Sequence, residues 1–208
     1  MKIAVAIYTT MFIICANPVF ALTKIIVTPT ARTLGKNRYS LEITRRGQLL
    51  NAQALNEEAG AKFGVGDRVQ LEVKTPIVKS ASGTVFFIKY TFASADDKLL
   101  ATAVGIDNIG RRNQAVPYIA VSRLFEPVDC TLGIAKDTNA QVKYFVGFDY
   151  RVGDKLHILT DRDQGQRTID SAGFQYDVSK IWHVKSALEA TRENGTNVYI
   201  KITYNGRY

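Results

Sequence analysis

The run TVFFIKYTF at residues 84–92 carries the clearest structural signal in this 208-residue chain. Aromatic and β-branched residues dominate the run, and such residues favour the pleated, half-buried surface of a β-strand. The acidic pair Asp96-Asp97 follows, and a second apolar run occupies residues 99–106. Two such runs around a short polar turn are typical of a β-hairpin. We therefore expect antiparallel β-structure at the centre of the chain.

Further segments with strand character lie on both sides of this hairpin. Apolar and polar residues alternate at 39–44 and 69–74, which is the period of a strand with one buried face. Gly, Asp and Asn interrupt the apolar segments at short intervals, which favours an antiparallel sandwich or barrel over a βαβ fold. We predict an all-β protein, built as an antiparallel sandwich or as two small packed β-modules. The other expected strands cover residues 24–28, 115–121, 141–150 and 156–159.

Two segments have mixed signals. Residues 49–62 are rich in Ala, Leu, Gln and Glu, and this composition favours one short helix between strands. Residues 181–193 also contain helix formers, but their apolar residues alternate. Asn194-Gly195 is then the typical turn of a hairpin that continues into residues 198–204. We interpret this second segment as a hairpin.

The N-terminus has the order of features found in a secretory signal peptide. Lys2 precedes an apolar run over residues 3–16, and Ala21 ends a candidate cleavage site. The apolar run is short for a helix that spans a bilayer, which needs about 20 residues. We expect residues 1–21 to be removed on export and the mature chain to be periplasmic or secreted.

Charge divides the mature chain into two parts. The sequence has a formal net charge of +8, and most of the positive excess of the mature chain lies within residues 22–126. We therefore expect a basic β-rich module over residues 22–126 and a second β-rich module over residues 127–208, which can also form one continuous domain. Val-Gly-Asp followed by a basic residue occurs at 65–68 and again at 152–155, which leaves a duplication open.

Few residues suggest a reaction. Cys130 is alone once Cys15 leaves with the signal peptide, so we interpret it as a small buried hydrophobe, with an intermolecular bridge or a nucleophile as alternatives. His157 and His183 have no further ligands at metal-binding spacing. No Gly-x-Ser-x-Gly motif is present. We predict no catalytic residue, no metal and no cofactor, which favours a non-enzymatic protein over a secreted hydrolase.

Two arginine pairs are the candidates for partner binding. Arg45-Arg46 precedes a glycine and Arg111-Arg112 follows one, which suggests exposed loop tips. A cationic patch there would attract an anionic partner. We hypothesise an exported binding or assembly protein of the periplasm, the envelope or the secreted space. It would use this basic face and exposed strand edges to engage a protein or an anionic component of the cell surface.

Other partners and functions rank below this hypothesis. Nucleic acid fits an exported protein poorly, and the oligomeric state is not predicted. A secreted membrane-active toxin would use the same basic face for contact with anionic lipid. A small outer-membrane barrel would explain the C-terminal strand, whose apolar residues alternate from Val198 to Tyr204 before the final Tyr208. The polar segments 45–68 and 160–180 argue against that barrel.

Overall fold

The computed structural model describes residues 25–26, 29–49, 51–77, 83–92, 100–110, 115–136, 141–164, 168–191 and 195–208. These residues form twelve β-strands, and the expected signal peptide lies outside them. Among the described residues, no helix is long and apolar enough to cross a membrane. The strands are β1 (Arg38–Gln48), β2 (Asn51–Val65), β3 (Val69–Pro76), β4 (Val85–Thr91), β5 (Leu100–Ile109), β6 (Val116–Phe125), β7 (Val128–Lys136), β8 (Val142–Val152), β9 (Leu156–Gln164), β10 (Ile169–Asp177), β11 (Trp182–Thr191) and β12 (Gly195–Arg207).

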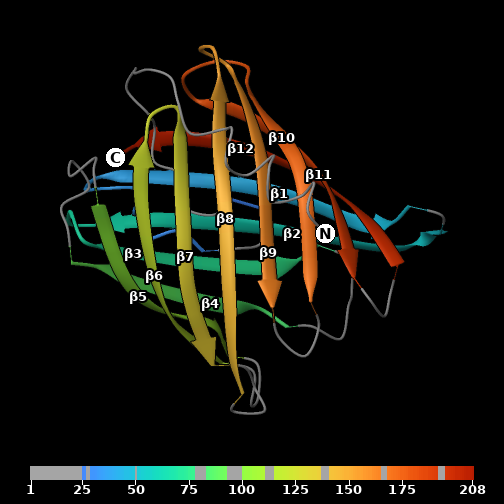
Figure 1. The fold of residues 1–208 in the computed structure, drawn as a ribbon, viewed down its shortest axis with the longest axis horizontal. Helices are drawn as coiled ribbons and strands as arrows, with labels where there is room; N and C mark the ends of the chain where they lie inside the picture. The colour runs from blue at the N-terminus through green and yellow to red at the C-terminus, as the bar shows by residue number, and fades with distance from the viewer. Residues whose placement is uncertain are drawn as a thin grey trace, which may run out of the picture.

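The strands close into one antiparallel barrel (Figure 1). Each strand pairs with its neighbours along the chain, and β1 pairs with β12 to complete the ring. The closing register sets Ile43 opposite Ile202 and Leu41 opposite Tyr204. Each of these twelve strands therefore has a partner on both sides, and none of them presents a free edge.

This barrel corrects the predicted architecture. The all-β, antiparallel character is as expected, but the β-sandwich and the two packed β-modules are wrong. Residues 22–126 and 127–208 both contribute strands to a single closed sheet. Alternation of apolar and polar residues did not distinguish the folds, because it appears in any sheet whose two faces meet different surroundings.

The expected helix at residues 49–62 is also absent. From Asn51 onward this stretch belongs to β2, which pairs with β1 on one side and β3 on the other. Tertiary pairing of this kind routinely overrides a modest helix propensity. Both predicted hairpins are confirmed, because β4 pairs antiparallel with β5 and β11 pairs antiparallel with β12. The turns of these two hairpins lie largely outside the described residues.

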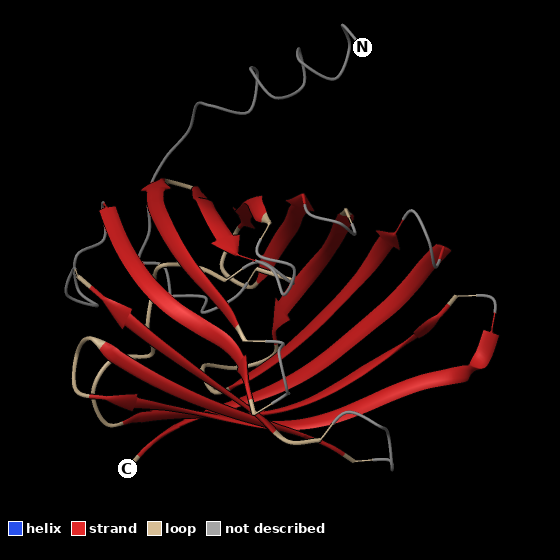
Figure 2. Cartoon of the chain, turned by 90° about the horizontal axis from the view of Figure 1, so that it is seen from below, coloured by secondary structure: helices blue, strands red, loops and turns tan. Residues whose placement is uncertain are grey.

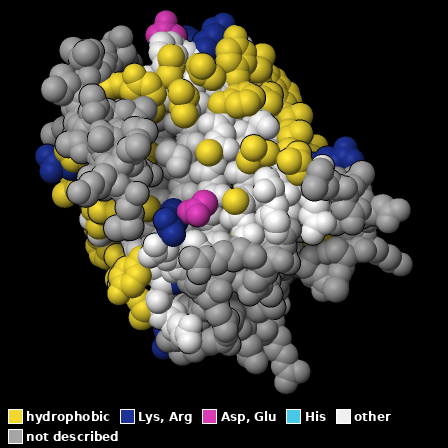
Figure 3. Space-filling view, turned by 45° about the vertical axis from the view of Figure 1, so that its right-hand side comes forward, with side chains coloured by type: hydrophobic (Ala, Val, Ile, Leu, Met, Phe, Trp, Pro, Cys, Tyr) yellow, Lys and Arg dark blue, Asp and Glu magenta, His cyan; other side chains and the backbone are white. Residues whose placement is uncertain are grey.

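Along most strands, side chains alternate between the two sides of the barrel wall. On β1, the inward Ser40, Glu42 and Thr44 are buried, whereas the outward Leu41 and Ile43 are 47% and 57% exposed. Exposed large apolar side chains occur on every one of the twelve strands. Figure 3 shows hydrophobic side chains gathered over one side of the molecule, with only scattered charged ones. The barrel is thus polar inside and apolar outside, the reverse of a water-soluble fold.

Candidate functional site

A cluster of charged side chains occupies one side of the barrel interior. Glu42 on β1 accepts hydrogen bonds from Lys62 at 2.8 Å and Lys201 at 3.0 Å, and Lys74 lies 3.2 Å away. Lys74 also lies 3.3 Å from Glu72. The Glu42 side chain is only 1% exposed. Strand pairing brings these residues together, since β1 has β2 and β12 as neighbours and β2 has β3.

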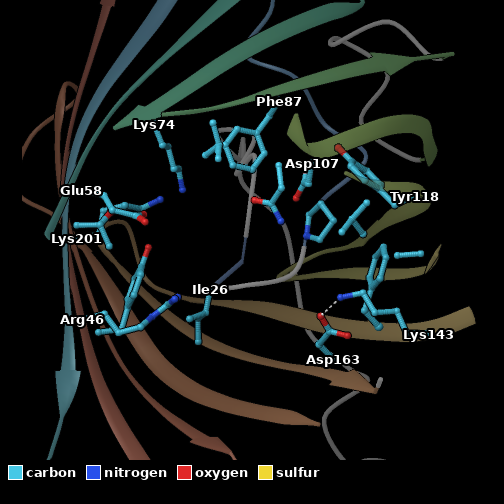
Figure 4. A pocket seen from close by; sticks show the side chains of 18 residues that line it. Ile26, Arg46, Glu58, Lys74, Phe87, Asp107, Tyr118, Lys143, Asp163 and Lys201 are labelled. Carbon is cyan, nitrogen blue, oxygen red and sulfur yellow. Dashed lines mark hydrogen bonds and ion pairs between the residues drawn. The ribbon is translucent and has the colours of Figure 1, made fainter. Parts of the chain in front are cut away.

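A cavity of about 310 Å³ lies inside the barrel, and we call it the vestibule (Figure 4). Its lining includes residues near the end of β1 and β9 and near the start of β4 and β8, so it lies away from Arg38 and Arg207. We call the barrel end that carries these two residues the terminal end. The lining consists of Ile26, Pro29, Thr44, Arg46, Glu58, Lys74, Val85, Phe87, Asp107, Asn108, Val116, Tyr118, Ala135, Lys143, Phe145, Asp163, Tyr199 and Lys201.

Charges in the vestibule are largely paired with one another. Lys143 donates a hydrogen bond to Asp163 at 2.8 Å, which is drawn in Figure 4. Arg46 lies 2.8 Å from the buried Glu189 and its guanidinium sits 5.5 Å from the centre of the Tyr199 ring. The vestibule therefore offers hydrogen-bonding groups and aromatic faces with little unbalanced charge.

A second polar network lies inside the barrel near the terminal end. The Nδ1 atom of His157 is 2.8 Å from Asp149, and the Nδ1 atom of His183 is 2.7 Å from Asp177. The Nε2 atom of His157 is 3.4 Å from Asp177, which links the two pairs. The sequence alone indicated no role for these histidines. The only signal in the sequence was that both histidines fall on the inward face of their strands. That signal can be used only once the inside of the barrel is known to be polar.

Part of the chain that precedes β1 lies inside the ring of strands (Figure 2). We call residues 25–26 and 29–35 the lumen segment. Its backbone N–H groups donate to inward side chains: Ile26 to Asp161 at 3.0 Å and Ala31 to Ser122 at 2.8 Å. Leu34 donates in the same way to the side-chain oxygen of Gln70, at 3.2 Å.

Inward lysines bind the carbonyl groups of the same segment. Lys89 on β4 donates to the carbonyl oxygens of Thr30 and Arg32, and Lys185 on β11 donates to that of Ile25. This corrects the strand expected at residues 24–28, of which Ile25 and the residue after it are described and belong to no strand. Side chains of the wall thus form hydrogen bonds with the backbone N–H and carbonyl groups that a β-strand would pair with a neighbouring strand.

The lumen segment also separates the vestibule from the terminal end. Ile26 and Pro29 belong to the lining of the vestibule, whereas Leu34 reaches Gln70 near the start of β3. The segment then joins β1 at Arg38. It therefore forms the floor of the vestibule on the side that faces the terminal end.

The structure places the two members of the first arginine pair on opposite sides of the wall. Arg45 lies outside the barrel, 3.2 Å from Glu57, and is 55% exposed. Arg46 points inward and lines the vestibule. Arg111 and Arg112 lie outside the described residues. Binding of a protein or an anionic partner by these four arginines stays a prediction. Cys130 is a free, half-buried cysteine.

Comparison with known proteins defines the fold. No family model matches the sequence, and no curated protein matches it. The solved KdgM porin superposes with a TM-score of 0.63, covering 79% of this chain and 98% of that chain, at 13% identity. The KdgM porin in complex with disordered oligogalacturonate gives the same TM-score and coverage at 12% identity. The fold is a porin-type barrel. An identity this low shows the fold alone.

The closed barrel overturns the hypothesised role as a binding or assembly protein, whereas a location in the cell envelope, which that hypothesis included, agrees with the barrel. That hypothesis needed exposed strand edges, and the twelve described strands of the closed ring offer none. It also needed a water-facing exterior, but every strand exposes at least one large apolar side chain on the outside. The outer-membrane barrel, ranked lower on the sequence, agrees better with the fold. Polar residues in segments 45–68 and 160–180 argued against it, yet Glu58, Lys62 and Asp161 from these segments point inward.

Proposed function

We propose that this chain is an outer-membrane channel of the porin type that passes small polar solutes. The observation that carries the proposal is the inverted polarity of the wall, with charged side chains inside and large apolar side chains outside on every strand. Exposing apolar surface to water is unfavourable by about 25 cal/mol per Å². The same surface is favourable in hydrocarbon, and a closed barrel also satisfies its backbone hydrogen bonds there.

Aromatic residues outside the barrel near the terminal end support a membrane boundary at that end. The rings of Tyr39 and Tyr204 have centroids 6.1 Å apart, and Trp182 lies 5.0 Å from Tyr204. Tyr90 and Phe92 make a further edge contact at 5.3 Å. Tyrosine and tryptophan concentrate at membrane–water interfaces, and outer-membrane barrels carry such girdles. Together with the expected signal peptide, this supports the outer membrane as the location, in place of the periplasm or the secreted space.

The vestibule supports solutes that are small and polar. One of the two KdgM porin structures is a complex with disordered oligogalacturonate. In this chain, Arg46, Lys143 and Lys201 of the vestibule each lie within 3.0 Å of a carboxylate oxygen. Paired cations attract a free anion less than unpaired ones do, because the neighbouring carboxylate offsets their field. We therefore propose solutes chosen by size and hydrogen bonding more than by charge.

Current recording across a planar lipid bilayer tests the proposal. The folded protein, purified from membranes, is expected to insert and to produce discrete current steps, whereas detergent alone produces none. The Arg32→Ala variant, whose lumen segment lacks its ion pair with Asp129, is recorded in parallel. The proposal is contradicted if both proteins are folded and inserted, yet neither produces current steps at any applied voltage.

A further inference from the structure

We propose that the lumen segment is a tethered plug, which closes the pore and must leave its site before solutes pass. This inference rests on the proposed channel function. The occupant of the site is part of this chain, the described residues between Ile25 and Gly35. The segment is tethered to β1 at the terminal end, so we expect it to leave the lumen toward that end.

Contacts from all around the ring hold the segment in place. Gln70 and Lys89 reach it from β3 and β4, and Ser122 reaches it from β6. Asp161 and Lys185 reach it from β9 and β11. These strands lie on different sides of a closed twelve-strand ring. One segment can touch all of them only by crossing the interior.

The contacting wall has the features of a site built for an extended peptide. Five wall side chains bind backbone N–H or carbonyl groups of the segment, as a neighbouring strand would. The wall also has glycine residues at two positions next to the segment. A Cβ atom on Gly64 would lie 1.7 Å from the carbonyl oxygen of Gly35, and one on Gly147 would lie 2.5 Å from Ile25.

One ion pair fixes the register of the segment in this site. Arg32 donates to Asp129 on β7 at 2.7 Å, and both side chains are at most 10% exposed. Ala31 beside it belongs to a buried apolar cluster with Ala103 and Ala120 of the wall. Ala31 is 0% exposed. A charged and an apolar anchor on consecutive residues fit only one placement of the segment.

Single-channel conductance of three variants tests the plug. The first variant lacks residues 25–33, the second carries Arg32→Ala, and the third carries Arg162→Ala. Arg162 is a matched control, because it pairs with Asp170 outside the barrel at 3.3 Å. We expect deletion to raise the mean conductance roughly threefold or more, since a barrel of this size without a plug leaves an open lumen. Arg32→Ala should raise the fraction of time spent in that open level, and Arg162→Ala should match the wild type.

A free peptide provides the second arm of the test. A peptide with the sequence of residues 25–35 is added on the terminal side of bilayers that hold the deletion variant. It should restore the low conductance in a concentration-dependent way. The same peptide with Arg32→Ala should need a concentration about tenfold higher for half-maximal block. Loss of a buried charged hydrogen bond weakens binding by about that factor.

The outcomes separate the plug from the channel. Higher conductance in the deletion variant and block by the peptide support the plug. Equal conductance of the wild type and the folded deletion variant overturns the plug and leaves the channel in place, as does a peptide that never blocks. A folded deletion variant that gives no current overturns the channel and the plug with it. If the deletion variant does not fold, the Arg32→Ala variant provides the test. The plug is overturned if this variant spends no larger fraction of time at the open conductance level than the wild type does.

Discussion

Glu42 shows, at the scale of single residues, how this barrel keeps charges in its interior. Three lysines from β2, β3 and β12 lie within 3.2 Å of its carboxylate. Each of these charges has lost most of its contact with bulk water, and partners must replace the lost hydration. The cluster ties four strands together on one side of the ring, across the seam where β1 meets β12.

Replacing Glu42 by alanine should therefore destabilise the barrel strongly. Glu42→Ala removes the carboxylate that the three lysines share, and breaking a buried pair costs about 3–5 kcal/mol. Urea unfolding in lipid vesicles measures the free energy of unfolding. Glu57→Ala is the control, because its partner Arg45 is exposed outside the barrel and such pairs contribute about 0–1 kcal/mol. Equal losses for the two variants would count against a buried charge cluster.

Leu132 provides a residue-scale test of the outer face. It lies in the middle of β7 and is 61% exposed. On a water-soluble protein, Leu132→Arg at so exposed a position should be nearly neutral. In a membrane barrel it should lower the free energy of unfolding by about 2–4 kcal/mol, whereas Val142→Arg at the start of β8 should cost about 0–1 kcal/mol. The same vesicle unfolding assay decides, and a neutral Leu132→Arg would place this face in water.

The lumen segment shows, at the scale of elements, how the final structure can differ from what the local sequence predicts. Lys24 to Thr28 reads KIIVT, which is strand-like in composition. The described residues of that stretch instead lie inside the barrel, where Asp161 and Lys185 bind their backbone. β-Propensity describes how well a residue fits a half-buried surface, and the barrel interior offers such a surface without a partner strand.

Thiol labelling tests the placement of this element. In a Cys130→Ser background, Ala31→Cys should react slowly with a thiol reagent that cannot cross membranes, because Ala31 is fully buried. Adding Arg32→Ala should speed the reaction about tenfold, since loss of one charged hydrogen bond raises the population of the released segment by about that factor. Fast labelling without Arg32→Ala, at the rate of an exposed cysteine, would mean that the segment does not reside in the lumen.

Hairpins were the elements that the sequence predicted best. Adjacent apolar runs with a polar turn identified β4–β5 and β11–β12, since both signals are local. The helix assigned to residues 49–62 was wrong, because β2 pairs with strands on both sides and its Glu58 and Lys62 point into the barrel. The aspartate–histidine network was missed because its members come from β8, β9, β10 and β11. Spacing along the chain does not reveal side chains that meet across a barrel.

Closure and inversion of polarity belong to the whole molecule, and local patterns could not predict either. A strand such as β4 has the same alternation whether its apolar face meets a core or lipid. Two global properties distinguish the cases: large apolar side chains are exposed on the outer face of every strand, and the first strand pairs with the last. The C-terminal alternation that ends at Tyr208 was the only local sign of a membrane barrel that we identified.

The balance of lumen charges predicts the ion selectivity of the proposed channel. Lysines and arginines of the vestibule are paired with carboxylates, so its net field is small. In a tenfold KCl gradient across a bilayer, the permeabilities of K⁺ and Cl⁻ should differ by less than about threefold. The reversal potential gives this ratio directly. A potential close to the ideal value for either ion would show that unpaired charge dominates the pore.

The claim on which the whole account depends is that the outside of the barrel lies in lipid. Trp182 tests it most directly, because it is the only tryptophan in the chain, is 45% exposed and lies outside the barrel among aromatic residues near the terminal end. Its fluorescence is measured in vesicles whose acyl chains carry bromine at different depths. We predict strong quenching, greatest for bromine near the headgroups, where tryptophan concentrates. Emission equal to that in unbrominated vesicles would contradict the account.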